Sequence, residues 1–119
     1  MTTLASPPLS KVRRAHGLVF LSGELPFAAD GSVPEGIAAQ TQLCLRRIGS
    51  TLETVGLTLK DIVQVTTYLT EPSDFGAFNA VYRQHFAEPF PTRTTVVAQL
   101  VVPGPRVELT VVAAAPSNV

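Results

Sequence analysis

The sequence predicts an α+β fold with the element order β-β-α-β-α-β-β, in a single domain over residues 1–119. Two segments have the apolar spacing of amphipathic helices, and they alternate with short runs rich in β-branched residues, which is the pattern of strands. Two helices can cover only one face of such a sheet, so we expect both on the same face. A chain of 119 residues is the usual size of one domain with its own core.

The first half of the chain predicts a hairpin followed by a long helix. Residues 11–16 and 18–24 flank His16-Gly17, a dipeptide that suits a tight turn. Residues 37–55 have helical periodicity, and Gly56 stands where a left-handed C-cap belongs. One stripe of this helix is expected to face the core: Ile37, Thr41, Cys44, Ile48, Leu52 and Val55.

The second half predicts a second helix among three further strands. Ser73 can cap a helix that runs to about Phe86, with Asp74 favourable in its first turn. Pro89 and Pro91 cannot continue that helix, because proline removes a donor and clashes with the preceding turn. The predicted strands are residues 62–69, 93–100 and 106–114.

Several predicted strands are apolar on both faces, among them Leu18-Val19-Phe20-Leu21 and residues 62–69. A second apolar sheet face on a single chain would exceed the exposed patches that soluble proteins tolerate. We therefore expect copies of the chain to cover this face in a closed ring, although the spacing does not give their number.

The charge balance excludes some classes of partner. The chain has 9 Lys and Arg against 9 Asp and Glu, and no basic stripe interleaved with aromatic residues, which argues against nucleic acid. No apolar run reaches the roughly 18 residues of a membrane span, and the first eight residues lack the layout of a signal peptide. We therefore expect a cytoplasmic protein that binds neither nucleic acid nor membrane.

The residues that commonly bind metals are scattered. Cys44 is the lone cysteine and lies on the apolar stripe, where a core thiol is expected. His16 and His85 are far apart and lack the spacing of a zinc motif. The sequence therefore predicts no metal and no cofactor.

Arg93 and Glu108 are charged residues embedded in two otherwise apolar strands. Arginine grips a planar carboxylate with two parallel hydrogen bonds, and a nearby glutamate can position or deprotonate a water. The pair therefore outlines a site that holds an organic acid and hydrolyses a bond beside its carboxylate. Two structural alternatives remain open: Arg93 and Glu108 pair with each other, or Arg93 caps the carbonyls of the preceding helix.

The chain resembles the RidA (YjgF-type) family of reactive-intermediate enamine and imine deaminases over nearly its whole length, in collinear order. This resemblance implies a chorismate-mutase-like fold in a homotrimer, with a central β-barrel and active sites in the clefts between subunits. The stretches that carry it are Leu21-Ser22-Gly23, Ala39-Gln40-Thr41, Gly56-Leu57, Asp61-Ile62-Val63, Asp74-Phe75, Asn79-Ala80-Val81-Tyr82, Pro91-Thr92-Arg93 and Val107-Glu108-Leu109.

The resemblance also implies roles for single residues. Arg93 matches the arginine that binds the substrate carboxylate, and Glu108 matches the glutamate that orients the attacking water. Gly23 and Asn79 match pocket residues. Thr95 stands where many members have cysteine, a position that can still contribute backbone groups.

Leu9 departs from the family pattern. Many members begin Gly-Pro-Tyr-Ser, with the tyrosine reaching the ligand, whereas this chain has Pro8-Leu9-Ser10. The change removes a hydroxyl and leaves an apolar wall, which favours a larger or more apolar substrate, or weaker turnover.

The implied reaction is hydrolytic deamination of 2-imino or enamine acids to 2-keto acids with release of ammonia. Three rivals stay open. The first is a non-catalytic trimer that binds a small carboxylate, and the second is a deaminase of an aminomuconate-like acid. The third, a ribonuclease or translation inhibitor, has less support because of the neutral charge.

Overall fold

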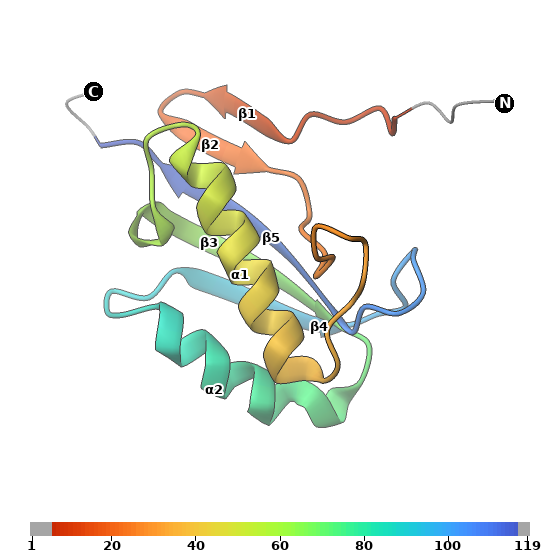
Figure 1. The fold of residues 1–119 in the computed structure, drawn as a ribbon. Helices are drawn as coiled ribbons and strands as arrows, with labels where there is room; N and C mark the ends of the chain where they lie inside the picture. The colour runs from red at the N-terminus through yellow and green to blue at the C-terminus, as the bar shows by residue number, and fades with distance from the viewer. Residues whose placement is uncertain (1–5, 117–119) are drawn as a thin grey trace, which may run out of the picture.

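In the computed structural model, which describes residues 6–116, five strands form one sheet and two α-helices lie against it (Figure 1). Residues 1–5, on which the expected lack of a signal peptide partly depends, lie outside the described part. The elements in chain order are β1 (Val12–Ala15), β2 (Leu18–Leu21), α1 (Ile37–Glu53), η1 (Leu59–Asp61), β3 (Ile62–Leu69), η2 (Pro72–Asp74), α2 (Phe75–His85), β4 (Thr92–Val97) and β5 (Val107–Ala114).

The strand order is β1-β2-β5-β3-β4, which places β4 at an edge of the sheet. All neighbouring strands are antiparallel except β3 and β4, which are parallel because α2 connects them as a crossover. Paired residues share a face of the sheet, so the register assigns each side chain to a face. Val65 of β3 is opposite Arg93 of β4 and Val111 of β5.

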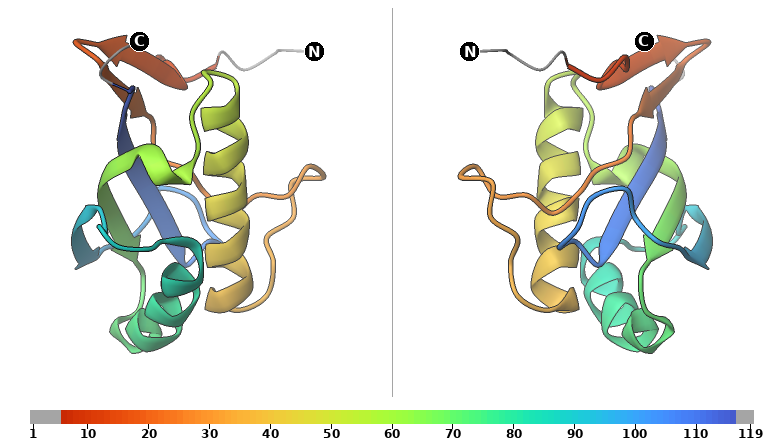
Figure 2. Two further views of the ribbon diagram at one scale, coloured as in Figure 1. Left: turned by 90° about the vertical axis from the view of Figure 1, so that its left-hand side faces the viewer. Right: turned by 90° about the vertical axis from the view of Figure 1, so that its right-hand side faces the viewer.

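Both helices pack on the same face of the sheet, as predicted (Figure 2). The stripe predicted for α1 is buried from Ile37 to Leu52, and Val55 packs partly buried against the core. From the sheet, the core receives alternate side chains of the three inner strands. These are Val19 and Leu21 of β2, Val65, Thr67 and Leu69 of β3, and Val107, Leu109, Val111 and Ala113 of β5.

The predicted start of the second helix is wrong in one respect. Ser73 lies inside η2 rather than capping a helix, and neither η2 nor α2 has a side-chain cap. The Asp74 carboxylate accepts instead from Arg106, whose Nε lies 3.0 Å from Oδ2. A cation at the start of β5 competes successfully for this carboxylate, because it brings a charge as well as donors.

The fourth strand is shorter than predicted. It ends at Val97 rather than Leu100, because its partner β3 ends at Leu69, opposite Val97. Beyond that point only the amide of Ala98 donates, to the carbonyl of Leu69. The strand pattern in the sequence continues to residue 100, but no strand is beside it there.

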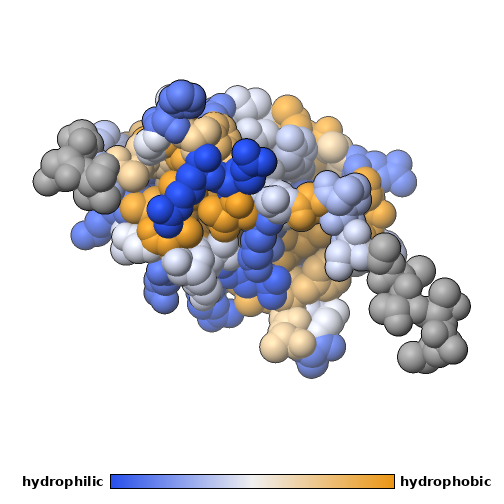
Figure 3. Space-filling view, turned by 90° about the horizontal axis from the view of Figure 1, so that it is seen from above, coloured by the Kyte–Doolittle hydropathy of each residue, from blue (hydrophilic) through white to orange (hydrophobic). Residues whose placement is uncertain are grey.

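The second face of the sheet carries no helix within residues 6–116. Exposed apolar side chains on this face include Phe20 of β2 and Val96 of β4, and Val101 is exposed in the loop after β4. Seen from above, at the β1 end of the molecule rather than onto this face, apolar patches lie between hydrophilic side chains (Figure 3). The prediction that copies of the chain cover this face remains open.

Candidate active site

Arg93 projects from β4 towards α2. It shares the helix-covered face of the sheet with Val65, which is fully buried, whereas Arg93 is half-buried at the edge. Its guanidinium carbon lies 4.7 Å from the ring centre of Tyr82, 5.3 Å from that of Phe78 and 5.7 Å from that of Phe75. These rings attract the cation through their electron-rich faces and leave its donors free for an anion.

A cleft of about 270 Å³ opens beside this guanidinium. The structure therefore brings together Arg93 and Asn79, two of the predicted site residues. Thr95 lies on the same face two residues further along β4, opposite buried Thr67, and does not line the cleft. The full lining is Asn79, Tyr82, Arg83, Phe90, Pro91 and Arg93.

Glu108 lies on the other face of the sheet. Its neighbours in β5, Val107 and Leu109, are fully buried under the helices, so alternation turns Glu108 the opposite way. Its carboxylate lies against Gly23, where an added Cβ would overlap Oε2 and lie 3.1 Å from the carboxyl carbon. Partial burial raises the pKa of the Glu108 carboxyl, which makes it a better proton acceptor once ionised.

Leu9 belongs to the same end of the molecule as Gly23. It is 63 % exposed and lines a hollow of about 180 Å³ with Gly23, Leu21 and Ile48. The segment is tied down by Ser22, whose hydroxyl donates to the carbonyl of Ser10 at 2.6 Å. The structure thus places Leu9 beside Gly23 on the side of the sheet that α1 covers, whereas the Glu108 side chain points to the other side.

The predicted site residues therefore form two separate groups in one chain, which we call half-sites. The Arg93 half-site contains Arg93 and Asn79, and the Glu108 half-site contains Glu108 and Gly23. Neither structural alternative for Arg93 occurs within the described residues, since no carboxylate of residues 6–116 lies within ion-pair distance of it and it donates to no helix carbonyl there.

The aromatic surroundings of Arg93 were missed by sequence reasoning. Phe75, Phe78 and Tyr82 have the spacing of one side of a helix, but the sequence does not link this side to Arg93. Their spacing would have shown a shared face, but which strand lies under that face depends on the parallel pairing of β4 with β3, which no local pattern gives.

Within residues 6–116 there is no cluster of three or more metal-ligating side chains. No described helix is both long and apolar enough to cross a membrane.

The family model described as endoribonuclease L-PSP matches residues 2–115. The chain belongs to this family, also known as the YjgF/RidA family. The mitochondrial protein mmf2 of Schizosaccharomyces pombe is 35% identical over 91 residues, which are 76% of this chain and 72% of that protein.

Solved structures of the family have the same fold. RidA from an Antarctic Psychrobacter species superposes with a TM-score of 0.86 at 28% identity, over 93% of this chain and 91% of that one. Escherichia coli TdcF with bound serine superposes with a TM-score of 0.85 at 27% identity, over 94% of this chain and 91% of that one. The predicted α+β, chorismate-mutase-like fold is confirmed. Because mmf2 is mitochondrial, the cytoplasmic location stays a prediction.

Proposed function

We propose that this YjgF/RidA-family protein hydrolyses reactive 2-imino or enamine acids to 2-keto acids and ammonia, in clefts formed by two copies of the chain. Arg93 of one copy binds the substrate carboxylate, with Asn79 beside it. Glu108 of a second copy holds the attacking water, and Gly23 leaves room for it.

The placement of the two half-sites supports this proposal most strongly. Arg93 and Glu108 lie on opposite faces of the sheet, two strands apart, so one chain cannot bring both to a small acid. β4 is an edge strand, and apolar side chains on it and in the loop that follows are exposed, which suits a closed ring of copies such as the expected homotrimer.

The chemistry follows from these positions. The two donors of Arg93 hold the carboxylate, and this fixes the adjacent C=N carbon. Glu108 accepts a proton from water as the oxygen adds to that carbon, which gives a carbinolamine. Glu108 then returns this proton to the nitrogen and accepts the hydroxyl proton as the C=O bond forms, the C–N bond breaks and ammonia leaves. Positioning provides much of the acceleration, because an iminium carbon is already electrophilic.

Serine bound to TdcF fits the substrate class, since an amino acid carries the carboxylate and nitrogen of a 2-imino acid. In this chain the Arg93 cleft has an aromatic wall in Tyr82 and Phe90, and Leu9 adds an exposed apolar surface beside Gly23. These surfaces favour imino acids with larger apolar side chains. The non-catalytic carboxylate binder and the aminomuconate-type deaminase remain alternatives within the same site.

RNA cleavage is the second candidate, because the family model is described as an endoribonuclease. The charges give it less support. The chain has zero formal net charge, and RNA binding depends on several Lys or Arg contacts to phosphates.

The deciding experiment measures ammonia released from freshly generated 2-imino acids by two variants, alone and mixed. Arg93→Ala and Glu108→Gln should each be inactive. Unfolding and refolding an equal mixture should restore activity in about a quarter of the clefts, where an intact Arg93 meets an intact Glu108 from another chain. Arg46→Ala, which removes an exposed arginine of α1, is the matched control and should keep full activity.

Mixtures that stay inactive would show that Arg93 and Glu108 do not act across two chains. If the wild-type protein binds keto acids through Arg93 but releases no ammonia, the non-catalytic binder replaces the deaminase. Cleavage of RNA by the wild type, with no imine hydrolysis, would establish the second candidate.

A further inference from the structure

The segment after β2 joins β5 through a single residue. Glu24 donates its amide to the carbonyl of Leu109 at 2.7 Å, and the amide of Leu109 donates to the carbonyl of Glu24 at 3.1 Å. Gly23 and Glu108 immediately precede these two residues. The backbone bridge therefore fixes how closely Gly23 approaches the Glu108 carboxylate.

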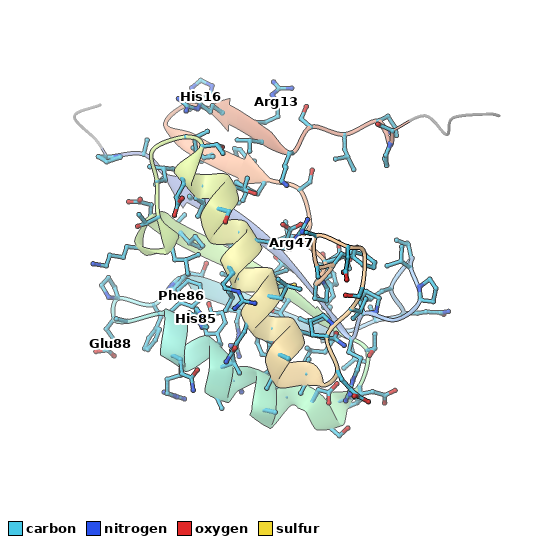
Figure 4. The ribbon with its side chains drawn as sticks, viewed as in Figure 1. Arg13, His16, Arg47, His85, Phe86 and Glu88 are labelled. Atoms are coloured by element: carbon cyan, nitrogen blue, oxygen red, sulfur yellow. The ribbon has the colours of Figure 1, made fainter. Side chains whose placement is uncertain are left out.

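A cation from α1 holds this segment in place. Arg47 Nε lies 3.1 Å from Oε1 of Glu24, and its Nη1 donates to the carbonyl of Phe27 at 2.7 Å. Cys44, one turn earlier in the helix, has its sulfur 3.4 Å from the carbonyl of Glu24. Figure 4 shows Arg47 on the side of α1 that faces the loop after β2.

We propose that Arg47 and Glu24 are positioning residues for the proposed hydrolysis, because their ion pair holds Gly23 against the Glu108 carboxylate. This inference depends on the proposed function for its catalytic consequence, but its structural part can be tested alone. It assigns a role to two residues that sequence reasoning did not select.

We expect the ion pair between Arg47 and Glu24 to order the segment after β2 rather than to stabilise the whole fold. The side chains of Arg47 and Glu24 are 35% and 14% exposed, and partly exposed ion pairs contribute little to the free energy of unfolding. Helix α1 is already held by its buried stripe. By contrast, residues 22–36 contain no strand or helix and join β5 only through the bridge at Glu24, so they depend on such contacts.

The test compares Arg47→Gln with Arg46→Gln. Both changes remove one positive charge from α1, but Arg46 is exposed and makes no hydrogen bond within the described residues. In Arg47→Gln, hydrogen exchange at the amides of Glu24 and Leu109 should accelerate at least about tenfold, while amides of β3 keep their protection. Arg46→Gln should exchange like the wild type.

Activity provides the second measurement. Arg47→Gln should lower kcat about tenfold with KM nearly unchanged, because the Glu108 half-site loses its geometry while the Arg93 half-site keeps its own. Arg47→Lys, which can still pair with Glu24, should recover most of the exchange protection and of kcat.

Equal exchange in Arg47→Gln and Arg46→Gln would overturn the proposal, and so would exchange that accelerates equally throughout the sheet. A kcat that stays at the wild-type value while the bridge exchanges faster would overturn the catalytic part. If the wild type has no deaminase activity, the proposed function fails, and the exchange measurements still decide whether Arg47 orders the Gly23 segment.

Discussion

Arg93 projects from an edge strand onto the rings of α2, whereas Glu108 lies in a central strand against the backbone of Gly23. Side chains of one helix create the surroundings of the cation. Hydrogen bonds between backbone segments, and a missing Cβ, create the surroundings of the carboxylate. Substitutions around Arg93 should therefore weaken substrate binding in small steps. Substitutions around Glu108 should instead displace its carboxylate and lower kcat sharply.

The largest loss of activity is expected from a substitution of Glu108. Glu108→Gln keeps the shape of the side chain but removes the proton acceptor, so kcat should fall about 10²–10⁴-fold with little change in KM. Steady-state kinetics on 2-imino acids checks this, with Glu53→Gln, an exposed acid at the end of α1, as the control. A kcat within twofold of the wild type would make Glu108 structural.

The same carboxylate predicts how activity and stability depend on pH. Burial raises the pKa of Glu108, so the activity should rise with pH through a midpoint above the usual glutamate range. The free energy of unfolding should depend on pH in the opposite direction. Burial disfavours the charged form, so the free energy of unfolding should fall as pH rises from the unfolded pKa through the higher folded pKa. Rate profiles and denaturant titrations of the wild type and Glu108→Gln test both trends, which the variant should lack.

Gly23→Ala separates the geometry of the carboxylate from its chemistry. The added Cβ would overlap Oε2 of Glu108, the far end of a flexible side chain, so the carboxylate should move while the sheet stays folded. We expect kcat to fall by about 10–100-fold, since misplacement by about 1 Å is that costly, with the melting temperature nearly unchanged. Gly49→Ala, where the added Cβ meets no atom within 4 Å, is the control.

The two half-sites also differ in how far the sequence predicted them. The alternation of side chains along a strand is enough to turn Glu108 away from Val107 and Leu109, because a two-residue period needs no tertiary information. The same alternation places Arg93 and Thr95 on one side of β4. What the sequence alone could not give is that these two groups face opposite sides of the sheet. That depends on parallel pairing of β4 with β3, which is a contact between segments far apart in the chain.

The errors in the predicted secondary-structure elements also come from contacts between segments far apart in the chain. Ser73 has the chemistry of an N-cap, but the chain enters α2 through η2, and the neighbouring Asp74 pairs with Arg106, more than 30 residues away. The role proposed for Arg47 was equally hidden, because its partner Glu24 is 23 positions earlier in the chain.

A smaller effect is expected from the rings around Arg93. Phe75 is 45% exposed, so Phe75→Ala should leave the core intact and remove one of three cation–π contacts. The loss of roughly 0.5–1 kcal/mol corresponds to about two- to fivefold weaker binding of a 2-keto acid. Calorimetric titration measures it, and Val101→Ala, in the exposed loop after β4, is the control. Unchanged affinity would mean that the ring does not act on the cation.

The smallest effect concerns a hydroxyl in the Arg93 half-site. The Tyr82 side chain is only 6% exposed, and its hydroxyl has no hydrogen-bond partner among residues 6–116. Its ring stacks on Phe86 at 4.4 Å, a contact that phenylalanine would keep. A buried hydroxyl without a partner costs about 1–3 kcal/mol, so Tyr82→Phe should raise the free energy of unfolding by up to about 1 kcal/mol after relaxation. Denaturant titration measures the change, and a less stable variant would show that the hydroxyl stabilises the folded protein through a hydrogen bond.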